Sequence, residues 1–423
     1  VKARETLQAF LDQYPDHANA ELAADLLEIV NKTGFDRTTI GCLLPLTGKY
    51  AVFGRQALAG IQLAVQKLSE TYQTDFKIII EDTMADPERT EQGVNRLYQE
   101  NVSAIIGPLL RVKEAGERAD NLGIPLIALT QKEDFPEQGE FLFSNFITPQ
   151  MQVQTLGSYL FGELGIQKAA ILYPDEKYGR KYMDLFWDTV LEYDAEIVGV
   201  ESYDGKGTDF TAALRKLTGA AYPIPEFLKP EPEEEEVLLD ENGEVIEPEE
   251  TNENARHKKD EEPVEIDFEA LFIPDSPSKI KLILPQLAFN DIRGIYLVGT
   301  NLWHHKSLLK RDVSMYNKNA IIADGFFDRS DNPETREFSE QFESLFERRP
   351  KFLEAIAYDT AAILLSTSRD EAVNSHDDLK DALQGGRIYE GATGITVFDP
   401  GGNAHRRLFL MTIKKNRFVE ISR

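Results

Sequence analysis

The chain has 423 residues, of which 28% are charged, and its formal net charge is −27 at pH 7. A chain of this length exceeds one typical hydrophobic core, and its acidic balance lacks the basic footprint that nucleic acids and anionic membrane surfaces require. The single cysteine, Cys42, excludes a disulfide framework and a cysteine-rich metal site, and we expect it to be a small buried side chain.

No stretch of the sequence approaches twenty apolar residues, so we predict no membrane span. Because the chain begins at Val1 rather than at a methionine, we expect a mature form from which a targeting segment has been removed. Lipid anchoring through such a segment stays open at this point.

The first 36 residues predict a helical hairpin. Apolar residues recur at helical spacing on both sides of Tyr14-Pro15-Asp16-His17, which breaks the pattern. The hairpin resembles one repeat unit of a tetratricopeptide-type array.

After Gly34 the pattern changes to short apolar runs that alternate with amphipathic stretches, as in parallel α/β sheets. The predicted strands are residues 39–44, 78–81, 104–106, 125–128, 169–173, 196–201, 270–273, 294–298 and 320–323. The predicted helices between them are residues 87–100, 113–122, 150–164, 178–193, 209–217 and 278–289. Two α/β lobes, each a doubly wound parallel sheet, follow from this order.

Residues 222–267 interrupt the second lobe with an acidic insertion. From Glu231 to Glu262 there are fifteen acids and three lysines or arginines, a net charge of −12. Such a segment has too few apolar side chains to offset the entropy of ordering, so we expect a solvated surface excursion. A calcium site and a protein-docking arm are the alternatives, although the EF-hand spacing is missing around Asp240.

The first strand, loop and helix, Ile40 to Val65, predict a ligand-holding turn. The carboxyl ends of parallel strands are where open α/β sheets bind ligands. Backbone N–H groups at the helix start, with the Thr47 hydroxyl and the rings of Tyr50 and Phe53, would form a polar and aromatic wall. An ordinary βα connection without a ligand is the alternative.

Several motifs together resemble the type I periplasmic binding proteins, in particular the leucine/isoleucine/valine-binding, extracellular ligand-binding receptor family. The motifs are Leu44-Pro-Leu-Thr-Gly48, Phe53-Gly54, Asp86-Pro87, Ile106-Gly107-Pro108, Tyr173-Pro-Asp175, Tyr178-Gly179 and Gly394-Ile-Thr-Val-Phe398-Asp399. The resemblance implies two lobes joined by three crossovers and closing on a small molecule by a hinge. It divides the chain into lobe 1, residues 37–149 and 328–391, and lobe 2, residues 150–327 and 392–423.

The same resemblance implies a ligand site lined by the loops that follow the strands. The positions that match are Thr47, Tyr50, Phe53, Leu109, Leu110, Arg111, Thr130, Gln131, Lys132, Tyr178, Asn301 and Trp303. Two of them depart from the amino-acid-binding pattern. Arg111 stands where a small hydroxyl residue usually holds a carboxylate, and Asn301 stands where an acid usually receives the ligand ammonium. These departures favour an anionic or peptide-like ligand over an ordinary amino acid, although Arg111 and Lys132 can also be solvated rim charges.

A second resemblance, to lipoprotein activators of penicillin-binding proteins, is carried by Asp267-Phe-Glu-Ala-Leu-Phe-Ile-Pro-Asp275-Ser276 and Gly299-Thr-Asn-Leu-Trp303. It implies an envelope regulator of peptidoglycan synthesis that binds a cell-wall synthase.

No phosphate-binding loop, nucleophile elbow, dinucleotide fingerprint or His-Glu-x-x-His motif is present, so we predict no enzyme and no cofactor. We expect a periplasmic or cell-envelope receptor of the ABC-transporter type, with a small solute and an ABC permease as partners and no nucleic acid.

Overall fold

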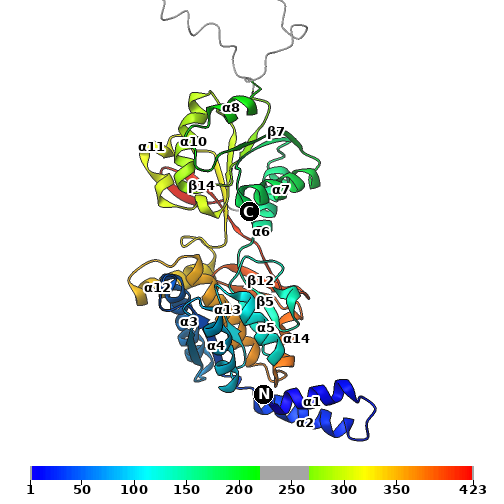
Figure 1. Cartoon of the computed structure of the whole chain (residues 1–423). Helices are drawn as coiled ribbons and strands as arrows, with labels where there is room; N and C mark the ends of the chain where they lie inside the picture. The colour runs from blue at the N-terminus through cyan, green and yellow to red at the C-terminus, as the bar shows by residue number, and fades with distance from the viewer. Residues whose placement is uncertain (1, 220–265, 422–423) are drawn as a thin grey trace, which may run out of the picture. The chain divides into compact units, whose positions relative to one another are not determined.

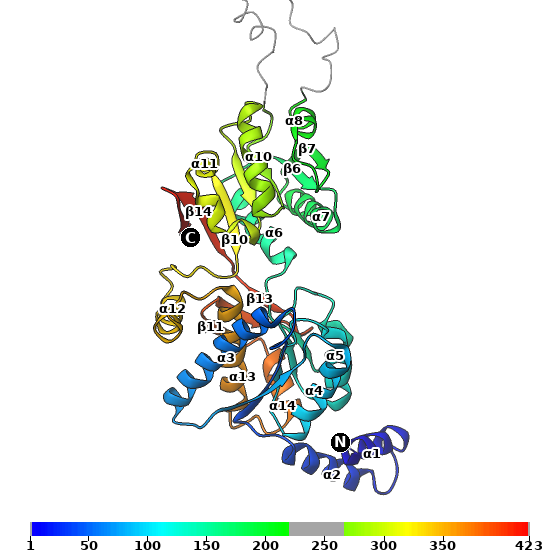
Figure 2. The same cartoon turned by 60° about the vertical axis from the view of Figure 1, so that its left-hand side comes forward.

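The computed structural model describes residues 2–219 and 266–421, and the chain divides into two compact units. The first unit comprises Val1–Leu156, Ile322–Met411 and Val419–Arg423, and the second comprises Gly157–Ile321 and Thr412–Phe418. Each unit contains a sheet with helices packed on it (Figures 1 and 2). The α/β class predicted from the sequence is therefore confirmed.

The first unit begins with a helical hairpin and continues as alternating strands and helices. Its elements are α1 (Lys2–Gln13), α2 (Ala20–Thr33), β1 (Thr39–Leu44), α3 (Ala51–Tyr72), β2 (Lys77–Asp82), α4 (Pro87–Gln99), β3 (Ile105–Ile106), α5 (Val112–Leu122), β4 (Leu126–Ala128), η1 (Pro136–Gln138), β5 (Leu142–Ser144), α6 (Pro149–Gly157), α12 (Pro333–Phe346), α13 (Phe352–Ser368), α14 (His376–Gln384), β11 (Tyr389–Gly391), β12 (Gly394–Phe398) and β13 (Ala404–Arg406).

The main sheet of the first unit has five strands in the order β2-β1-β3-β4-β5, and every adjacent pair is parallel. Side chains of β1 alternate between its two faces, as the period of a strand requires. Ile40, Cys42 and Leu44 enter the core that holds α3 and α13, whereas Leu43 enters the core that holds α4 and α5. The sheet is buried on both faces, which explains the continuous apolar sequence of β1.

Helices α3 and α13 cross at a glycine. A Cβ atom on Gly60 would lie 2.0 Å from the backbone oxygen of Glu354, so only glycine permits this approach. Helix α4 begins as its sequence predicts, because the Asp86 side chain accepts from the Arg89 N–H at 3.0 Å and Pro87 occupies the first turn.

The second unit carries the other βα series. Its elements are η2 (Ser158–Glu163), β6 (Lys168–Pro174), α7 (Lys177–Glu192), β7 (Glu196–Tyr203), α8 (Thr211–Leu217), β8 (Ala270–Phe272), α10 (Pro277–Phe289), β9 (Tyr296–Gly299), η4 (Asn301–Trp303), η5 (Lys306–Leu309), α11 (Arg311–Ser314), β10 (Ala320–Asp324), β14 (Phe409–Lys414) and β15 (Arg417–Glu420).

Its sheet has seven strands in the order β15-β14-β10-β9-β8-β6-β7. Strand β6 pairs in parallel with β7 and β8, and β8 pairs in parallel with β9, whereas β14 runs antiparallel to β10. The unit boundaries fall within β10, β14 and β15 and at the end of α6, where the helix changes to the π-helical turn η2.

The units differ from the sequence-based division mainly at residues 392–411, which lie in the first unit. Phe398 and Ala404 belong to the first unit's core, and Arg406 donates to the Thr393 hydroxyl at 2.7 Å and also to the Asn145 side chain. These contacts attach the β11–β12–β13 sheet to the first unit. The predicted acidic insertion, 222–267, lies outside the described residues except for its last two positions, where Asp267 pairs with Lys168 at 2.5 Å.

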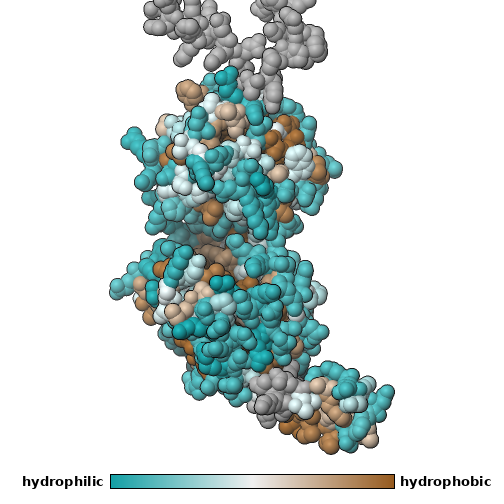
Figure 3. All heavy atoms as spheres, viewed as in Figure 1, coloured by the Kyte–Doolittle hydropathy of each residue, from teal (hydrophilic) through white to brown (hydrophobic). Residues whose placement is uncertain are grey.

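The predicted helical hairpin is present as α1 and α2. Ala23 is buried, whereas Leu22 and Leu26 are 58% and 43% exposed. Apolar side chains are visible on the hairpin in Figure 3. Among the described residues, no helix is long and apolar enough to cross a membrane.

Candidate functional site

In the first unit, the carboxyl ends of the five parallel strands meet at one edge of the sheet. The loops that leave β1, β2, β3 and β4 at this edge contain residues 45–50, 83–86, 107–111 and 129–132. Nine of the predicted site residues fall in or next to these loops. Their common placement follows from the topology, because parallel strands deliver their ends to the same side.

Asp82 fixes the first of these loops. Its carboxylate accepts from the Leu46 N–H at 2.8 Å, from the Thr47 N–H at 3.3 Å and from the Thr47 hydroxyl at 2.5 Å, and also from the Met84 N–H at 3.0 Å. Partial burial acts to raise the pKa of Asp82, but the hydrogen bonds from Thr47 and the backbone outweigh it and hold the pKa below its usual value. Thr47 is therefore placed at the edge, with its hydroxyl hydrogen engaged by Asp82.

The start of α3 presents Phe53 to solvent. A Cβ atom on Gly54 would lie 2.1 Å from the Pro45 backbone oxygen, so the helix start is held directly against the end of β1. This contact leaves Phe53 49% exposed. Tyr50 forms the N-cap position of α3, and the Lys49 ammonium lies 5.3 Å from its ring centre.

Arg111 follows β3 and is held by the backbone. It adopts a left-handed conformation with φ of 63° before α5, and its Nε donates to the Ala85 oxygen at 3.0 Å. Among the described residues, no carboxylate lies within about 4 Å of this guanidinium. Leu109 packs against the core, whereas Leu110 is 36% exposed. The backbone contact therefore fixes a cation that has no ionic partner within residues 2–219 and 266–421.

The loop after β4 contributes a second cation. Thr130 is buried, and its hydroxyl accepts from the Lys132 N–H at 3.3 Å. Gln131 and Lys132 are exposed, and in the described part of the chain no acid pairs with Lys132. The structure thus gathers two cations without an ionic partner among the described residues, an exposed aromatic ring and hydroxyl groups along one edge.

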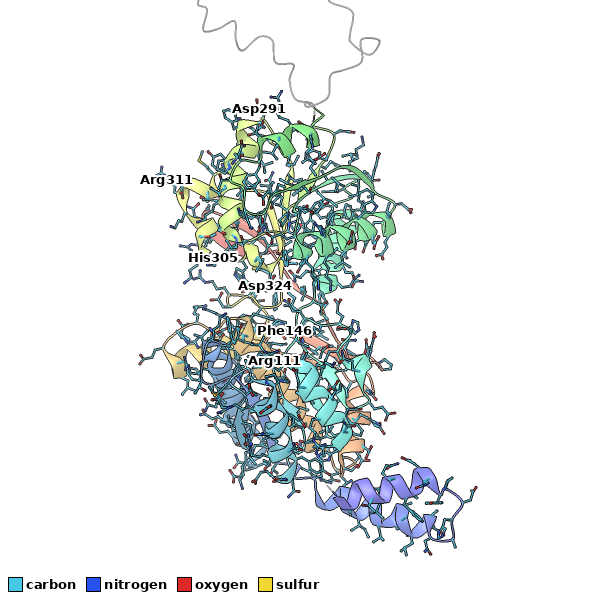
Figure 4. All side chains as sticks on the ribbon, viewed as in Figure 1. Arg111, Phe146, Asp291, His305, Arg311 and Asp324 are labelled. Carbon is cyan, nitrogen blue, oxygen red and sulfur yellow. The ribbon has the colours of Figure 1, made fainter. Side chains whose placement is uncertain are left out.

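Phe146 is an edge residue that the sequence did not indicate. It follows β5, and its ring packs against Phe352 with centroids 5.0 Å apart at 71°. Gly325 permits this packing, since its Cβ would lie 2.4 Å from the Phe352 ring. Figure 4 shows Phe146 and Arg111 at the same end of the first unit. The rings of Phe146 and Phe352 are both half-buried. Their contact joins positions far apart in the sequence, so the sequence alone does not distinguish them from core residues.

The second unit repeats the construction of the first βα turn. A Cβ atom on Gly179 would lie 2.1 Å from the Pro174 backbone oxygen, the same distance as between a Cβ atom on Gly54 and the Pro45 oxygen. Tyr178 therefore occupies the position in the second unit that is equivalent to that of Phe53 in the first, and its side chain is 37% exposed. Its hydroxyl lies 3.1 Å from the Thr300 hydroxyl, and burial of the phenol raises its pKa.

Trp303 does not form part of an exposed surface, and its predicted role as a ligand-contacting ring stays a prediction. The side chain is fully buried and its Nε1 donates to the Ile273 oxygen at 3.1 Å. The Trp303 ring packs directly against Gly299, because a Cβ atom on that glycine would lie 2.1 Å from Cδ2 of the ring. Trp303 therefore supports the turn after β9, where Asn301 is half-buried.

Asp275 and Tyr203 complete the second-unit edge and were missed from the sequence. Asp275 follows β8, which lies between β9 and β6 in the sheet, and is half-buried. The Tyr203 hydroxyl donates to Oδ2 of Asp275 at 2.6 Å. Burial first, and then the contact with Asp275, raise the pKa of Tyr203, so the phenol stays protonated and continues to donate. The sequence contains one indication of this residue, because Asp275 is the first acidic residue after a predicted strand.

Other polar groups have structural partners. Glu81 pairs with Arg96 at 2.6 Å, and His305 Nδ1 lies 2.9 Å from the Ser307 hydroxyl. Within residues 2–219 and 266–421, no group of three or more His, Cys, Asp or Glu side chains is arranged to hold a metal ion. Cys42 is buried as predicted, and burial raises the pKa of its thiol to about 12.

The first unit also has a groove of about 480 Å³ between α3 and α12, lined by residues that include Leu63, Lys67, Glu340 and Leu345. None of its lining residues belongs to the strand-end loops, so it is separate from the edge described above.

Part of the chain matches a known protein family. Residues 37–222 match the family described as periplasmic binding protein. A Leu/Ile/Val-binding protein homologue of Brucella melitensis is 23% identical over 197 residues, covering 45% of this chain and 53% of that protein. The chain thus spans about half the length of the curated relatives it matches.

Solved structures extend the likeness across nearly the whole fold. A putative branched-chain amino acid ABC transporter protein from Rhodospirillum rubrum matches with a TM-score of 0.74 at 17% identity, covering 90% of this chain and 99% of that one. The substrate-binding protein LivJ from Streptococcus pneumoniae, solved with isoleucine, matches with a TM-score of 0.58 at 20% identity, covering 90% and 99%. The chain has the fold of the type I periplasmic binding proteins, and over 45% of its length it is similar in sequence to a Leu/Ile/Val-binding protein homologue, as its motifs predicted.

Proposed function

We propose that this protein is a non-enzymatic solute-binding receptor of the ABC-transporter type, which closes its two units on a small, carboxylate-bearing, amino-acid-like solute. The observation that carries the proposal is the Arg111 guanidinium, which is held by the Ala85 oxygen at the strand edge of the first unit and has no ionic partner among the described residues. A guanidinium fixed through Nε keeps its other N–H groups for a planar carboxylate. Phe53 and Leu110, both partly exposed at the same edge, would contact an apolar side chain.

The kinship with Leu/Ile/Val-binding proteins supports this proposal, as does the structure of LivJ with isoleucine. A receptor of this kind would work in the periplasm or cell envelope and would deliver its solute to an ABC permease. The absence of a recognisable catalytic motif in the sequence is consistent with binding alone.

The proposal is tested by thermal unfolding in the presence of a library of amino acids, short peptides and carboxylates. A solute whose free concentration is one hundred times its dissociation constant should stabilise the protein by about 2.7 kcal/mol. Arg111→Ala should abolish the shift, whereas Lys113→Ala, on the exposed surface of α5 next to Glu117, should leave it unchanged. The proposal fails if no compound raises the melting temperature, or if Arg111→Ala responds as the unmodified protein does.

The alternative of an envelope regulator is favoured by one observation, the exposed Leu22 and Leu26 on the helical hairpin. A hairpin with an exposed apolar stripe is suited to protein contacts. If this is its role, Leu22→Ser with Leu26→Ser should abolish capture of a purified cell-wall synthase without changing the melting temperature of the α/β units. Unchanged capture, or no capture by the unmodified protein, would refute it.

A further inference from the structure

The second unit carries a cluster of exposed cations on a strongly acidic chain. Residues 310–318 and 414–417 are thirteen positions with six lysines and arginines and one acid, Asp312, although the whole chain has a net charge of −27. All six basic side chains are exposed, and none of them forms an ion pair within residues 2–219 and 266–421. We call this set the basic surface; it comprises Lys310, Arg311, Lys318, Lys414, Lys415 and Arg417.

The two segments of the basic surface are held together in the fold. The Ser314 hydroxyl, at the end of α11, donates to Oδ1 of Asn416 at 2.8 Å. Strand β10 begins two residues after Lys318 and runs antiparallel to β14, so Lys318 lies at the end of the sheet where β14 turns into β15. Helix α11 and β14 lie side by side in Figures 1 and 2, and Figure 4 shows Arg311 at the outer face of the unit. The cations therefore share one surface.

The turn between β14 and β15 has an unfavourable arrangement of charge. Its two central residues, Lys415 and Asn416, have φ of 49° and 57°. Asparagine, aspartate and glycine are the usual residues in this left-handed conformation, whereas lysine is uncommon there. Lys414 and Arg417 lie opposite each other across the turn, and like charges in that position destabilise a hairpin. Negative charge from outside the hairpin would therefore stabilise it.

The chain contains such negative charge in the same unit. Residues 231–250 have eleven acids and no lysine or arginine, and they lie in the sequence between Gly219 and Ile266, the nearest described residues. At about 3.3 Å per residue, the connections on the two sides can span about 40 and about 50 Å, whereas a compact unit of this size is about 36 Å across. The chain is therefore long enough for residues 231–250 to reach the basic surface.

A segment attached to the same unit has an advantage over a separate partner. Its binding is intramolecular, at an effective concentration on the order of millimolar, which a free acidic protein would have to exceed. A planar anionic membrane is a poorer match, because it would also face the acidic remainder of the chain. Met315, 60% exposed beside Ser314, adds an apolar contact of the kind found in polypeptide interfaces, and Val237 to Leu239 stand among the acids.

We propose that the basic surface binds residues 231–250 of the same chain, so that the acidic insertion is a docking arm whose first partner is its own unit. The inference is independent of the proposed function, because none of the six cations belongs to the candidate solute site. An acidic partner from outside would have to displace these residues, and a rise in ionic strength would weaken the contact.

The experiment is zero-length cross-linking of the full chain with a carbodiimide, which joins carboxylates to lysine amines that touch them. Mass spectrometry of the digested monomer should find residues 231–250 joined to the four lysines of the basic surface at least about 5-fold more often than to Lys206 or Lys216, at a Debye length of about 30 Å. Lys216 is a strict control, because it is exposed and only three positions before Gly219. Salt at about 1 M, where the Debye length is about 3 Å, should remove the difference.

Charge reversal provides the variant and a matched control. Lys414→Glu with Lys415→Glu should lower cross-linking at the remaining lysines of the basic surface by about 5-fold or more. Lys206→Glu with Lys216→Glu changes the net charge of the chain by the same amount and should leave that cross-linking unchanged. All four positions are exposed, so both variants are expected to fold.

Three results would overturn the inference. One is cross-linking to Lys216 equal to that at the basic surface, which would show only random encounters with the unit. Another is cross-links found in dimers alone and increasing with protein concentration, which would make the occupant a second copy of the chain. The third is sedimentation of the full chain with vesicles of phosphatidylcholine and phosphatidylserine that is lost on charge reversal at Lys414 and Lys415, which would assign the surface to an anionic membrane.

Discussion

Removing the charge of Asp82 should destabilise the first unit without affecting the second. The Asp82 carboxylate accepts four hydrogen bonds, which join the end of β2 to the loop after β1. In Asp82→Asn one oxygen becomes an amide donor, so at least one N–H or the Thr47 hydroxyl loses its acceptor. A hydrogen bond to a charged group contributes about 1.5–3 kcal/mol, and water replaces part of it at this half-exposed position. We therefore expect a loss of about 1–2 kcal/mol, or about 2–8 °C in the melting temperature.

The two tryptophans, Trp187 and Trp303, both lie in the second unit, so tryptophan emission reports the second unit alone, whereas far-UV circular dichroism reports the secondary structure of both units. Asp82→Asn should shift the dichroism transition and leave the emission transition in place. Asp75→Asn is the control, because the Asp75 side chain is 88% exposed and its lysine partner is 3.6 Å away.

The effect should depend on pH with a defined sign. Because the folded pKa of Asp82 lies below its usual value, the carboxylate stabilises the folded state above the unfolded pKa of about 3.9. This contribution is lost as the pH falls through the folded pKa, so the difference between the unmodified protein and Asp82→Asn should shrink below about pH 3.9. A difference that does not change with pH, or an equal loss in Asp75→Asn, would refute the role given to this carboxylate.

Three further predictions concern packing. Gly54→Ala and Gly179→Ala each place a Cβ atom 2.1 Å from a carbonyl oxygen, and each should lower the free energy of unfolding in urea by about 3 kcal/mol. The control is Gly162→Ala, whose nearest contact is 3.4 Å and which should lower it by less than about 0.5 kcal/mol. Equal effects of the three substitutions would contradict the close approach. Trp303→Phe should cost about 2–3 kcal/mol, because it leaves a cavity and the Ile273 oxygen unpaired, and an unchanged unfolding midpoint would place the ring outside the core. Cys42 should react with a thiol reagent only as fast as the protein unfolds, since its thiol is buried with a pKa of about 12, and rapid labelling of the native protein would show an exposed strand.

The sequence predicted the parts of the fold that depend on local patterns. Strand β1 has the predicted bounds, Thr39–Leu44, because its six residues are apolar or β-branched and lie between turn-forming segments. The turns at Gly54 and Gly179 were recognisable because each glycine follows an aromatic residue at a helix start.

The directions of the side chains at the site could not be predicted from the sequence. Trp303 stands in a loop motif, but its burial depends on Gly299 beneath the ring and on the Ile273 oxygen from the neighbouring strand. The pair Phe146–Phe352 joins residues more than two hundred positions apart, and the contact of Asp275 with Tyr203 joins the ends of two strands that are not adjacent in the sheet. Periodicity carries no information about such contacts.

The most direct test of the central claim is calorimetric titration of the chain with L-leucine, L-isoleucine and L-valine, after any co-purified solute has been removed by unfolding, dialysis and refolding. We predict saturable binding of at least one of them at one site per chain, which Arg111→Ala should abolish and Arg111→Lys should keep in part. Absence of binding by all three, with no small molecule released from the freshly purified protein in mass spectrometry, would contradict it.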